Sequence, residues 1–327
     1  MRTRFADQSG LLSPVLAWVL PAAAAAVAAL HQGLAVDGDS HLFIWAGQTL
    51  LSSHWSQAFA LSTVQAGPLQ LALFGSVGRW HAALALVLTV GTALLVVAAA
   101  RAAGVRSPAL LGGVGVLAVV TGVTGNGLGG HPADAVLPLV WILAAAEARR
   151  GHAWRAGLLV GLSAGFETWG ILGVAVLALA PRKRDALAGT FLAGATALAL
   201  FAPFMLGGHF HMLSFHWYVS YPSPVSMLVP EGTPFGWPLR LVQAAFAVSA
   251  GVAVVRLLRR SPHVIWAAPL AIIVVRLLLD PLLLSYYLAG PKALILVGAA
   301  LGAARWAQLR SVRREPNASV NRPAPAR

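Results

Sequence analysis

The sequence predicts an all-α fold, a polytopic bundle of membrane-spanning helices. Hydrophobic residues make up 58% of the 327 positions and charged residues only 10%, whereas an ordinary soluble domain carries about 25% charged residues. The mean hydropathy is +0.76. Apolar runs of about 20 residues, the length that crosses a hydrocarbon core of about 30 Å, recur along the chain. Cysteine is absent, which excludes a disulfide framework, a thiolate nucleophile and a zinc–thiolate site.

Eight apolar runs are candidates for full spans, and we expect a single transmembrane domain over residues 1–309. The runs are 11–31, 81–100, 107–125, 134–148, 186–206, 238–257, 263–280 and 289–305. Arg2 and Arg4 precede the first run, which places the N-terminus in the cytoplasm by the positive-inside rule. The first run could also be a cleaved signal peptide, but its length favours a retained span. The Arg- and Pro-rich residues 310–327 predict a disordered, basic cytoplasmic tail.

The net charge of +13 follows the same topology. When the spans alternate from a cytoplasmic N-terminus, all but four of the 23 Lys and Arg residues fall on the cytoplasmic side. The four exceptions are Arg79, Arg240, Arg276 and Lys292. In a soluble protein this charge would indicate nucleic acid. Here we expect a multi-pass plasma-membrane protein with both termini in the cytoplasm. The expected partners of the positive charge are membrane lipids of the anionic inner leaflet, and no nucleic acid is expected.

One apolar stretch, residues 156–181, breaks the alternation. It lies between Arg155 and Arg182, which both look cytoplasmic, yet it is long enough for only one crossing. We therefore expect a re-entrant pair of half-helices, 156–163 and 169–180, because broken backbone at membrane depth is tolerated only inside protein or beside a cavity. The alternative is one ordinary span with a misplaced charge. Glu167 lies in the expected break, where a hydrogen-bonding structural role is favoured over a functional one.

Polar and aromatic residues gather in three segments on the predicted extracytoplasmic side. These segments are 31–80, 124–134 and 207–237. The first contains Asp37 and Asp39, two of only ten acidic residues in the chain, although simple solvation of a loop and an Asp-Gly turn are alternative roles. It is also expected to form an interfacial helix at 40–51 and a short helix starting at Gly67-Pro68-Leu69.

The second and third segments carry histidines beside few carboxylates. Asp134 follows His131 at an expected helix N-terminus, where the helix dipole stabilises a carboxylate, so capping competes with a catalytic role. The third segment has His209 and His211 in a His-x-His motif, but no adjacent carboxylate or cysteine completes a ligand set. We expect no required metal and no other cofactor.

A further charged pair lies near the outer end of the seventh run. Arg276 and Asp280 are four residues apart, which suits a structural ion pair on one helix face. An intramembrane arginine also often marks a substrate pathway, so Arg276 or Lys292 could hold a lipid phosphate instead. The spacing leaves both interpretations open.

Several of these motifs follow one another in an order that resembles the GT-C superfamily of polytopic glycosyltransferases. The resemblance is to actinobacterial polyprenyl-phosphate-mannose-dependent mannosyltransferases and covers roughly residues 10–300. It rests on Asp39 followed by Phe43 and Ala46-Gly47, on Val64-Gln65-Ala66-Gly67-Pro68-Leu69, on Gly130-His131-Pro132 followed by Asp134, on Gly161-Leu162, and on Asp280-Pro281 followed by Tyr286-Tyr287. Phe43, Ala133 and Glu167 depart from the residues common in those relatives.

The resemblance implies an inverting hexosyltransferase that moves a sugar from a polyprenyl-phosphate donor to a lipid- or glycan-linked acceptor outside the membrane. Asp39 would be the general base and Asp37 the second candidate. The donor phosphate and substrate would be held by residues from Gln65, Arg79, His131, Asp134, Arg276, Asp280, Tyr286, Tyr287 and Lys292. The competing classes are a lipid or small-molecule transporter or flippase, which would also show broken helices, and a non-catalytic envelope-assembly protein.

Overall fold

The protein is helical throughout in the computed structural model, which describes residues 5–314 and the side chains of residues 14–125 and 127–310. Helices account for 74% of the structure and strands for 2%. The strands β1 (Trp217–Tyr218) and β2 (Pro234–Phe235) pair antiparallel, with Trp217 opposite Phe235. The predicted all-α class is confirmed.

Five helical segments of the described chain are long and apolar enough to cross a membrane. They are Pro14–His31 within α1 (Phe5–His31), α4 (His81–Ala103), α8 (Lys183–Leu206), α9 (Trp237–Leu258), and Ser285–Arg310, which is mostly α11 (Ala289–Arg314). This finding supports a helical, multi-pass membrane protein. The five helices do not establish the expected total of eight full spans.

The other three expected spans form shorter helices, namely α5 (Pro108–Val120), α6 (Ala133–Arg149) and α10 (Val264–Leu278). Local chemistry explains two of these lengths. The chain leaves α5 at Gly122, whose φ of +76° lies in the left-handed region. It leaves α10 just before Asp280-Pro281, because a residue before proline is driven out of the helical conformation.

The end of α11 corrects one expectation. Residues 310–314, expected to belong to a disordered tail, continue this helix to Arg314. Alanine, leucine, glutamine and arginine, which favour helix, dominate its last turns and explain the extension. Residues 315–327, the rest of the expected tail, lie outside the described residues, as do Arg2 and Arg4, on which the expected orientation depends.

The 156–181 stretch forms a hairpin. Helix α7 (Ala153–Phe166) and the 3₁₀ helix η3 (Thr168–Leu179) are separated by Glu167, whose backbone is extended at φ −154°, ψ 142°. Helix α7 therefore runs three residues beyond the expected end of the first half-helix. Side-chain hydrogen bonds satisfy the backbone of the turn. The Ser163 hydroxyl and the Trp141 indole N–H both donate to the Gly170 carbonyl, at 2.9 and 3.0 Å.

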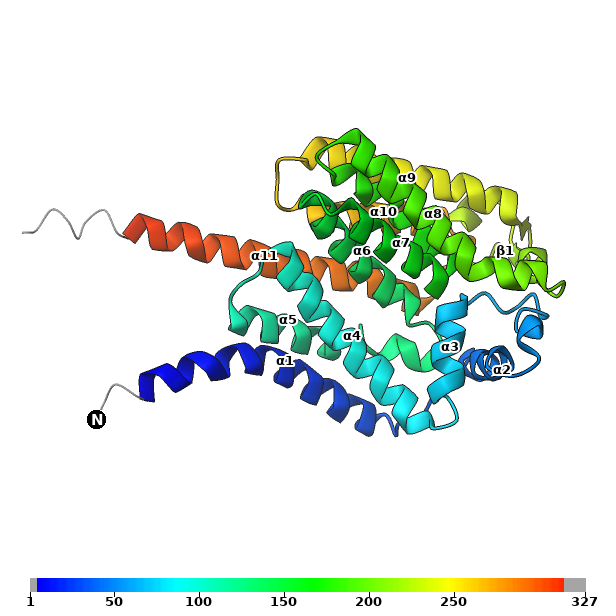
Figure 1. Cartoon of the computed structure of the whole chain (residues 1–327), viewed down its shortest axis with the longest axis horizontal. Coiled ribbons are helices and arrows are strands. Elements are labelled where there is room, and N and C mark those ends of the chain that lie inside the picture. The colour runs from blue at the N-terminus through cyan, green and yellow to red at the C-terminus, as the bar shows by residue number, and fades with distance from the viewer. Residues whose placement is uncertain (1–4, 315–327) are drawn as a thin grey trace, which may run out of the picture.

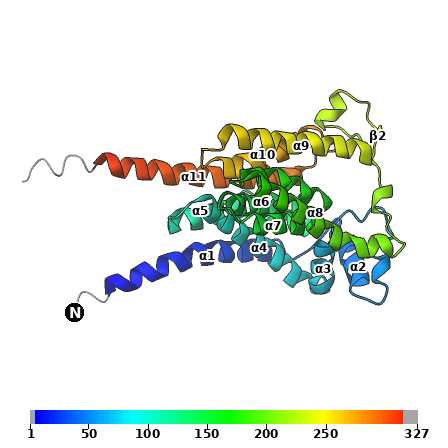
Figure 2. The same ribbon diagram turned by 45° about the horizontal axis from the view of Figure 1, so that its top comes forward.

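The helices are arranged so that the outer-loop elements share one end of the molecule. Helix α6 is central and contacts α4, α7, α10 and α11, while α1 packs on α4 and α5. Figure 1 shows the start of α1 and the end of α11 projecting together, opposite α2 (Ser40–Leu50), α3 (Pro68–Val77) and the strand hairpin. In Figure 2 the hairpin stands beyond the start of α9, above α2 and α3.

Helices α2 and α3 are the two short helices expected in the first outer segment, and they cross in very close contact. A Cβ atom at Gly47 would collide with the Leu71 carbonyl oxygen, and one at Gly75 with the Gly47 backbone. Small residues permit this backbone approach. The Phe43 and Phe74 rings meet edge to face beside the crossing, 6.0 Å apart. This packing fixes the start of α2, and so Asp39, relative to the bundle.

Candidate active site

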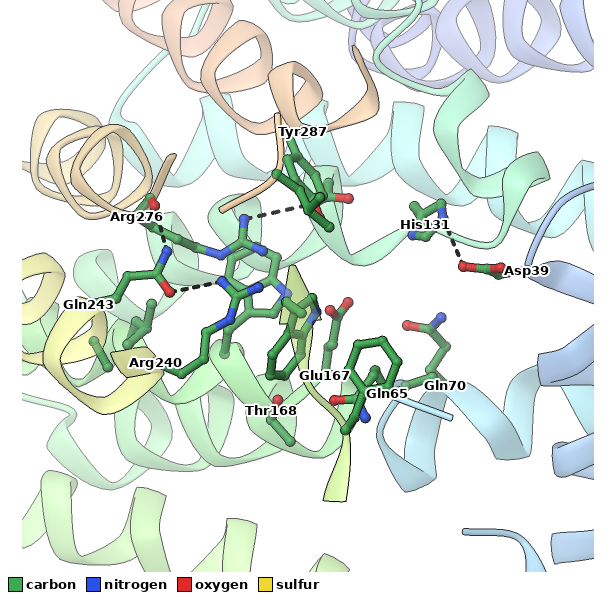
Figure 3. A pocket seen from close by; sticks show the side chains of 18 of the residues that line it. Asp39, Gln65, Gln70, His131, Glu167, Thr168, Arg240, Gln243, Arg276 and Tyr287 are labelled. Atoms are coloured by element: carbon green, nitrogen blue, oxygen red, sulfur yellow. Dashed lines mark hydrogen bonds and ion pairs between the residues drawn. The ribbon is translucent and has the colours of Figure 1, made fainter. Parts of the chain in front are cut away.

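A cavity of about 330 Å³ opens at the end of the bundle that carries α2, α3 and the strand hairpin (Figure 3). Its volume is in the range of small-molecule binding sites, which are about 300–1,000 Å³. Elements from most of the chain line it, including the α2 start, the loop before α6, the α7–η3 break, α9 and α10. Seven residues expected from the sequence line this one cavity: Asp39, Gln65, His131, Asp134, Arg276, Tyr286 and Tyr287.

Backbone contacts between two loops bring Asp39 and His131 together. The Asp37 N–H donates to the Leu128 carbonyl at 2.8 Å, and the Ser40 hydroxyl donates to the same oxygen at 2.9 Å. Gly130 then turns the chain with φ +95°. A Cβ atom at Gly130 would lie 2.8 Å from the Ser40 nitrogen, so both the backbone angle and the contact require glycine.

The Asp39 carboxylate faces His131 and is not used to cap α2. Asp39 holds the N-cap position, yet its side chain makes no capping hydrogen bond. Its Oδ2 lies 3.4 Å from His131 Nε2, and the side chain is 58% exposed. The His131 ring stacks on Tyr286, with centroids 3.9 Å apart and planes within 7°. Asp39 is therefore accessible to a ligand in the cavity, and its neighbour is held by an aromatic contact.

The charge state of His131 follows from its surroundings. Burial lowers the pKa of His131 below its ordinary value of 6.5, outweighing the nearby Asp39 carboxylate, which raises that pKa. The imidazole is therefore neutral near pH 7 and offers one N–H donor and one nitrogen acceptor. Neutral His131 can orient the Asp39 carboxylate without forming a full ion pair with it.

The opposite side of the cavity carries two arginines from neighbouring helices. Arg240 on α9 donates through Nη1 to the carboxylate of Asp280 and to the side-chain oxygen of Gln243, both at 2.9 Å. Arg276 on α10 forms longer ion pairs, 3.8 Å to Asp134 and 3.9 Å to Asp280. The i,i+4 pair of Arg276 and Asp280 expected from the sequence is confirmed.

Both arginines line the cavity and keep hydrogen-bond donors that are not fully used. The Arg276 ion pairs are longer than the 3.5 Å limit of a hydrogen bond. Within the described residues, Arg240 Nε is buried and has no hydrogen-bond partner. Each group also lies over a tryptophan, Arg240 over Trp217 and Arg276 over Trp169, at 4.2 Å. These cation–π contacts hold both guanidinium groups against the aromatic wall of the cavity.

The floor of the cavity is formed where the α7–η3 break meets the loop before α3. The Gly67 N–H donates to the Phe166 carbonyl at 2.8 Å, and Ala66 forms an isolated bridge with Glu167. A Cβ atom at Gly67 would collide with the Gly165 carbonyl, so only glycine permits this approach. Glu167 therefore lines the cavity, beyond the hydrogen-bonding role expected for it.

Gln70 adds an acceptor on the same floor. Its side chain is 1% exposed, and its amide N–H donates to the Gly130 carbonyl at 3.1 Å. Its side-chain oxygen has no hydrogen-bond partner among the described residues. In Figure 3 this oxygen points in the direction of Glu167. An unsatisfied buried acceptor in a cavity wall is suited to a ligand hydroxyl, because leaving it unpaired costs free energy.

Four residues expected at the site do not line the cavity. Asp37 is exposed, and its carboxylate accepts the Gly38 N–H at 2.7 Å, which closes the expected turn. Asp280 is fully buried behind the two arginines. Arg79 is exposed and stacks on Trp80 at 4.0 Å. Lys292 is exposed on α11.

The cavity also contains residues that the sequence interpretation did not assign to a site: Gln70, Glu167, Trp169, Trp217, Trp237, Arg240 and Gln243. A signal for Arg240 was present, because it is one of only four cations on the predicted outer side. Trp217 and Trp237 lie in the predicted outer segment 207–237, but the spacing of the tryptophans does not distinguish a cavity wall from a lipid-facing surface.

Comparisons with protein-family models, with curated proteins and with solved structures find no match to this chain. The resemblance in motif order therefore stays a prediction, and the functional argument depends on the geometry of the cavity. Within the described residues, no group of three His, Asp or Glu side chains is placed to hold a metal ion.

Proposed function

We propose that the chain is an inverting, GT-C-like membrane glycosyltransferase. Its donor would be a polyprenyl-phosphate sugar, carrying mannose or another hexose or pentose, and its acceptor a lipid- or glycan-linked hydroxyl on the extracytoplasmic side. One observation carries the proposal: a single cavity has an accessible carboxylate, Asp39, on one side and two guanidinium groups, Arg240 and Arg276, on the other.

The proposed reaction needs these two sides at once. The acceptor oxygen attacks the anomeric carbon, and Asp39 takes the proton from the acceptor hydroxyl. The bond between the anomeric carbon and the phosphate oxygen breaks, and its electron pair leaves with the lipid phosphate. Arg240 and Arg276 stabilise the charge that grows on that phosphate. Inversion follows because attack and departure take place on opposite faces of the sugar carbon.

The apolar part of the cavity suits a prenyl chain. Phe215, Trp217 and Trp237 line it beside the arginines, and Leu241 and Ala244 of α9 continue this wall. Leu241 is 67% exposed on the outer surface of α9. An apolar wall that runs from a polar cavity to the outer face of an apolar helix provides a lateral route for a lipid-linked donor.

The test is sugar transfer in proteoliposomes supplied with radiolabelled polyprenyl-phosphate sugars and a mixture of lipid acceptors. Asp39→Asn should reduce transfer by about 10²- to 10⁴-fold, the usual contribution of a positioned general base. Asp37→Asn decides between the two carboxylate candidates and should retain transfer. Asp185→Asn, which removes a carboxylate beside Arg184 on α8, is the charge-matched control.

Two results would contradict the proposal. Equal transfer by wild type and Asp39→Asn would remove Asp39 from the chemistry. Movement of the donor across the bilayer without any new glycosidic bond would favour the transporter class.

A further inference from the structure

A second cavity, of about 390 Å³, lies far from Asp39, at the other end of α6. Asp134 in the outer cavity and Glu147 in this one are thirteen positions apart on that helix. At 1.5 Å per residue they are about 20 Å apart. The polar lining comes from Arg101 and Arg106 at the α4–α5 connection and from Glu147 and Arg150 at the end of α6.

The single carboxylate of this cavity already has its partners. Glu147 Oε1 lies 2.6 Å from Arg150 Nη1, and Oε2 lies 2.8 Å from His152 Nδ1. Arg155 approaches the same carboxylate at 3.8 Å. Because Glu147 is shared among these groups, it cannot also neutralise the arginines across the cavity.

Arg101 and Arg106 are therefore an uncompensated positive pair. Both are exposed, and within the described residues neither has an ion-pair or side-chain hydrogen-bond partner. Guanidinium groups bind phosphate oxygens with two parallel N–H donors, so two of them at one cavity suit a phosphate ligand.

The remaining lining is apolar and comes from different helices. Trp18 on α1, Leu143 on α6 and Leu159 on α7 border the cavity. A small hydrated anion has no use for such a wall, whereas the acyl chains of a lipid pack on it. Tryptophan is also the residue that favours the headgroup depth of a bilayer.

We propose that this cavity binds the phosphate of an anionic phospholipid headgroup, with Arg101 and Arg106 as its ligands. The acyl chains lie along Trp18, so that the lipid links α1 to α6 and α7. Inorganic phosphate shares the headgroup chemistry but not the apolar contacts. The site is separate from the outer cavity and does not depend on the transferase proposal.

Native mass spectrometry of the full chain in a mild detergent tests the site. The probes are phosphatidylglycerol, phosphatidylcholine with the same acyl chains, and inorganic phosphate. We expect phosphatidylglycerol to be retained in preference to phosphatidylcholine. Arg101→Gln/Arg106→Gln should weaken its binding by roughly 10- to 30-fold, at about 1 kcal/mol per arginine.

Two matched variants separate the cavity from general surface charge. Arg256→Gln/Arg260→Gln removes the same charge from exposed positions at the end of α9 and should change retention less than about twofold. Arg101→Lys/Arg106→Lys keeps the charge and should retain most of the lipid, which also controls for folding.

The outcomes discriminate clearly. Saturable binding of inorganic phosphate, lost in the glutamine variant and without lipid preference, would support a phosphate site with a soluble ligand. Equal retention of the two phospholipids without phosphate binding, or equal loss in the α4–α5 and α9 variants, would overturn the proposal.

Discussion

The two sides of the outer cavity are built in different ways. Asp39 and His131 come from loops, their side chains are 58% and 23% exposed, and they approach to 3.4 Å. Arg240 and Asp280 come from α9 and the end of α10, are 13% and 0% exposed, and form a 2.9 Å ion pair. Gln243 and Arg276 extend this second set into a buried network.

This difference in burial suits the two sides of the cavity to different roles, one in positioning a ligand and the other in proton transfer. A buried ion pair is held rigidly, because removing one partner leaves a charge without compensation in a medium of low dielectric. A half-exposed pair can exchange protons with solvent or substrate at little cost to the fold. In this cavity the rigid side would bind an anion, while the exposed side could change its protonation state during a reaction.

The largest expected effect comes from breaking the rigid side. Asp280→Asn removes a buried charge that faces two arginines, so we expect the free energy of unfolding to fall by about 3–5 kcal/mol. Chemical denaturation in detergent micelles, followed by circular dichroism, measures this loss. Asp39→Asn is the matched substitution on the exposed side and should cost less than about 1 kcal/mol. Similar losses in both variants would remove the contrast between the two sides.

The loop before α6, which holds His131 beside Asp39, gives the next largest effect. Gly130→Ala introduces a Cβ at φ +95° and against the Ser40 nitrogen, which should cost about 1–3 kcal/mol of stability. Transfer should fall at least tenfold, because the loop displaces His131 from Asp39. Gly129→Ala is the control, since that glycine has no atom within 4 Å of an added Cβ. Unchanged activity in Gly130→Ala would show that this loop does not position the base.

The charge state of His131 predicts a smaller, pH-dependent effect. Because the pKa of His131 is lowered below 6.5, transfer should be constant near neutral pH and decline only at a pH below 6.5. There, protonated His131 pairs with the Asp39 carboxylate and weakens it as a base. His131→Asn should abolish this acid limb in a pH–rate profile, whereas an identical profile in wild type and variant would exclude His131 as its source.

The same shift has a consequence for stability. A histidine with a lowered pKa binds fewer protons in the folded state than in the unfolded state. The contribution of His131 to the stability of the fold therefore rises with pH between its lowered pKa in the folded state and 6.5. This contribution is lost as the pH falls through that range. When the free energy of unfolding is plotted against pH, the curves of wild type and His131→Asn should diverge in that window and run parallel above it.

The smallest effects are expected at the two outer cations that lie away from the cavity. Arg79→Gln and Lys292→Gln should each change transfer by less than about twofold, since both side chains are exposed and neither lines the cavity. Arg240→Gln should lower transfer at least tenfold, because it removes a guanidinium from the cavity wall. Assays at one donor concentration below saturation allow the three variants to be compared. A strong defect in Lys292→Gln would move the phosphate site towards α11.

The sequence by itself determined the helical membrane class, the two short helices of the first outer segment, the break near Glu167 and the Arg276–Asp280 pair. Each of these depends on residues close together in the chain, where apolar run length, proline position and i,i+4 spacing act directly. It also selected seven residues that share the outer cavity. Scarce acidic residues and an intramembrane arginine indicated some of them, and the order of the motifs added Gln65, Tyr286 and Tyr287.

Only the tertiary structure decided how these residues meet. It separated Asp39 from Asp37, moved Asp280 behind the arginines, and brought Arg240, Gln70 and Glu167 to the cavity wall. It also placed Arg101 and Arg106 beside a second cavity. The physical reason is that these contacts join segments far apart in the chain through close packing at glycines such as Gly67 and Gly130, and no local pattern encodes which distant backbone a glycine will admit.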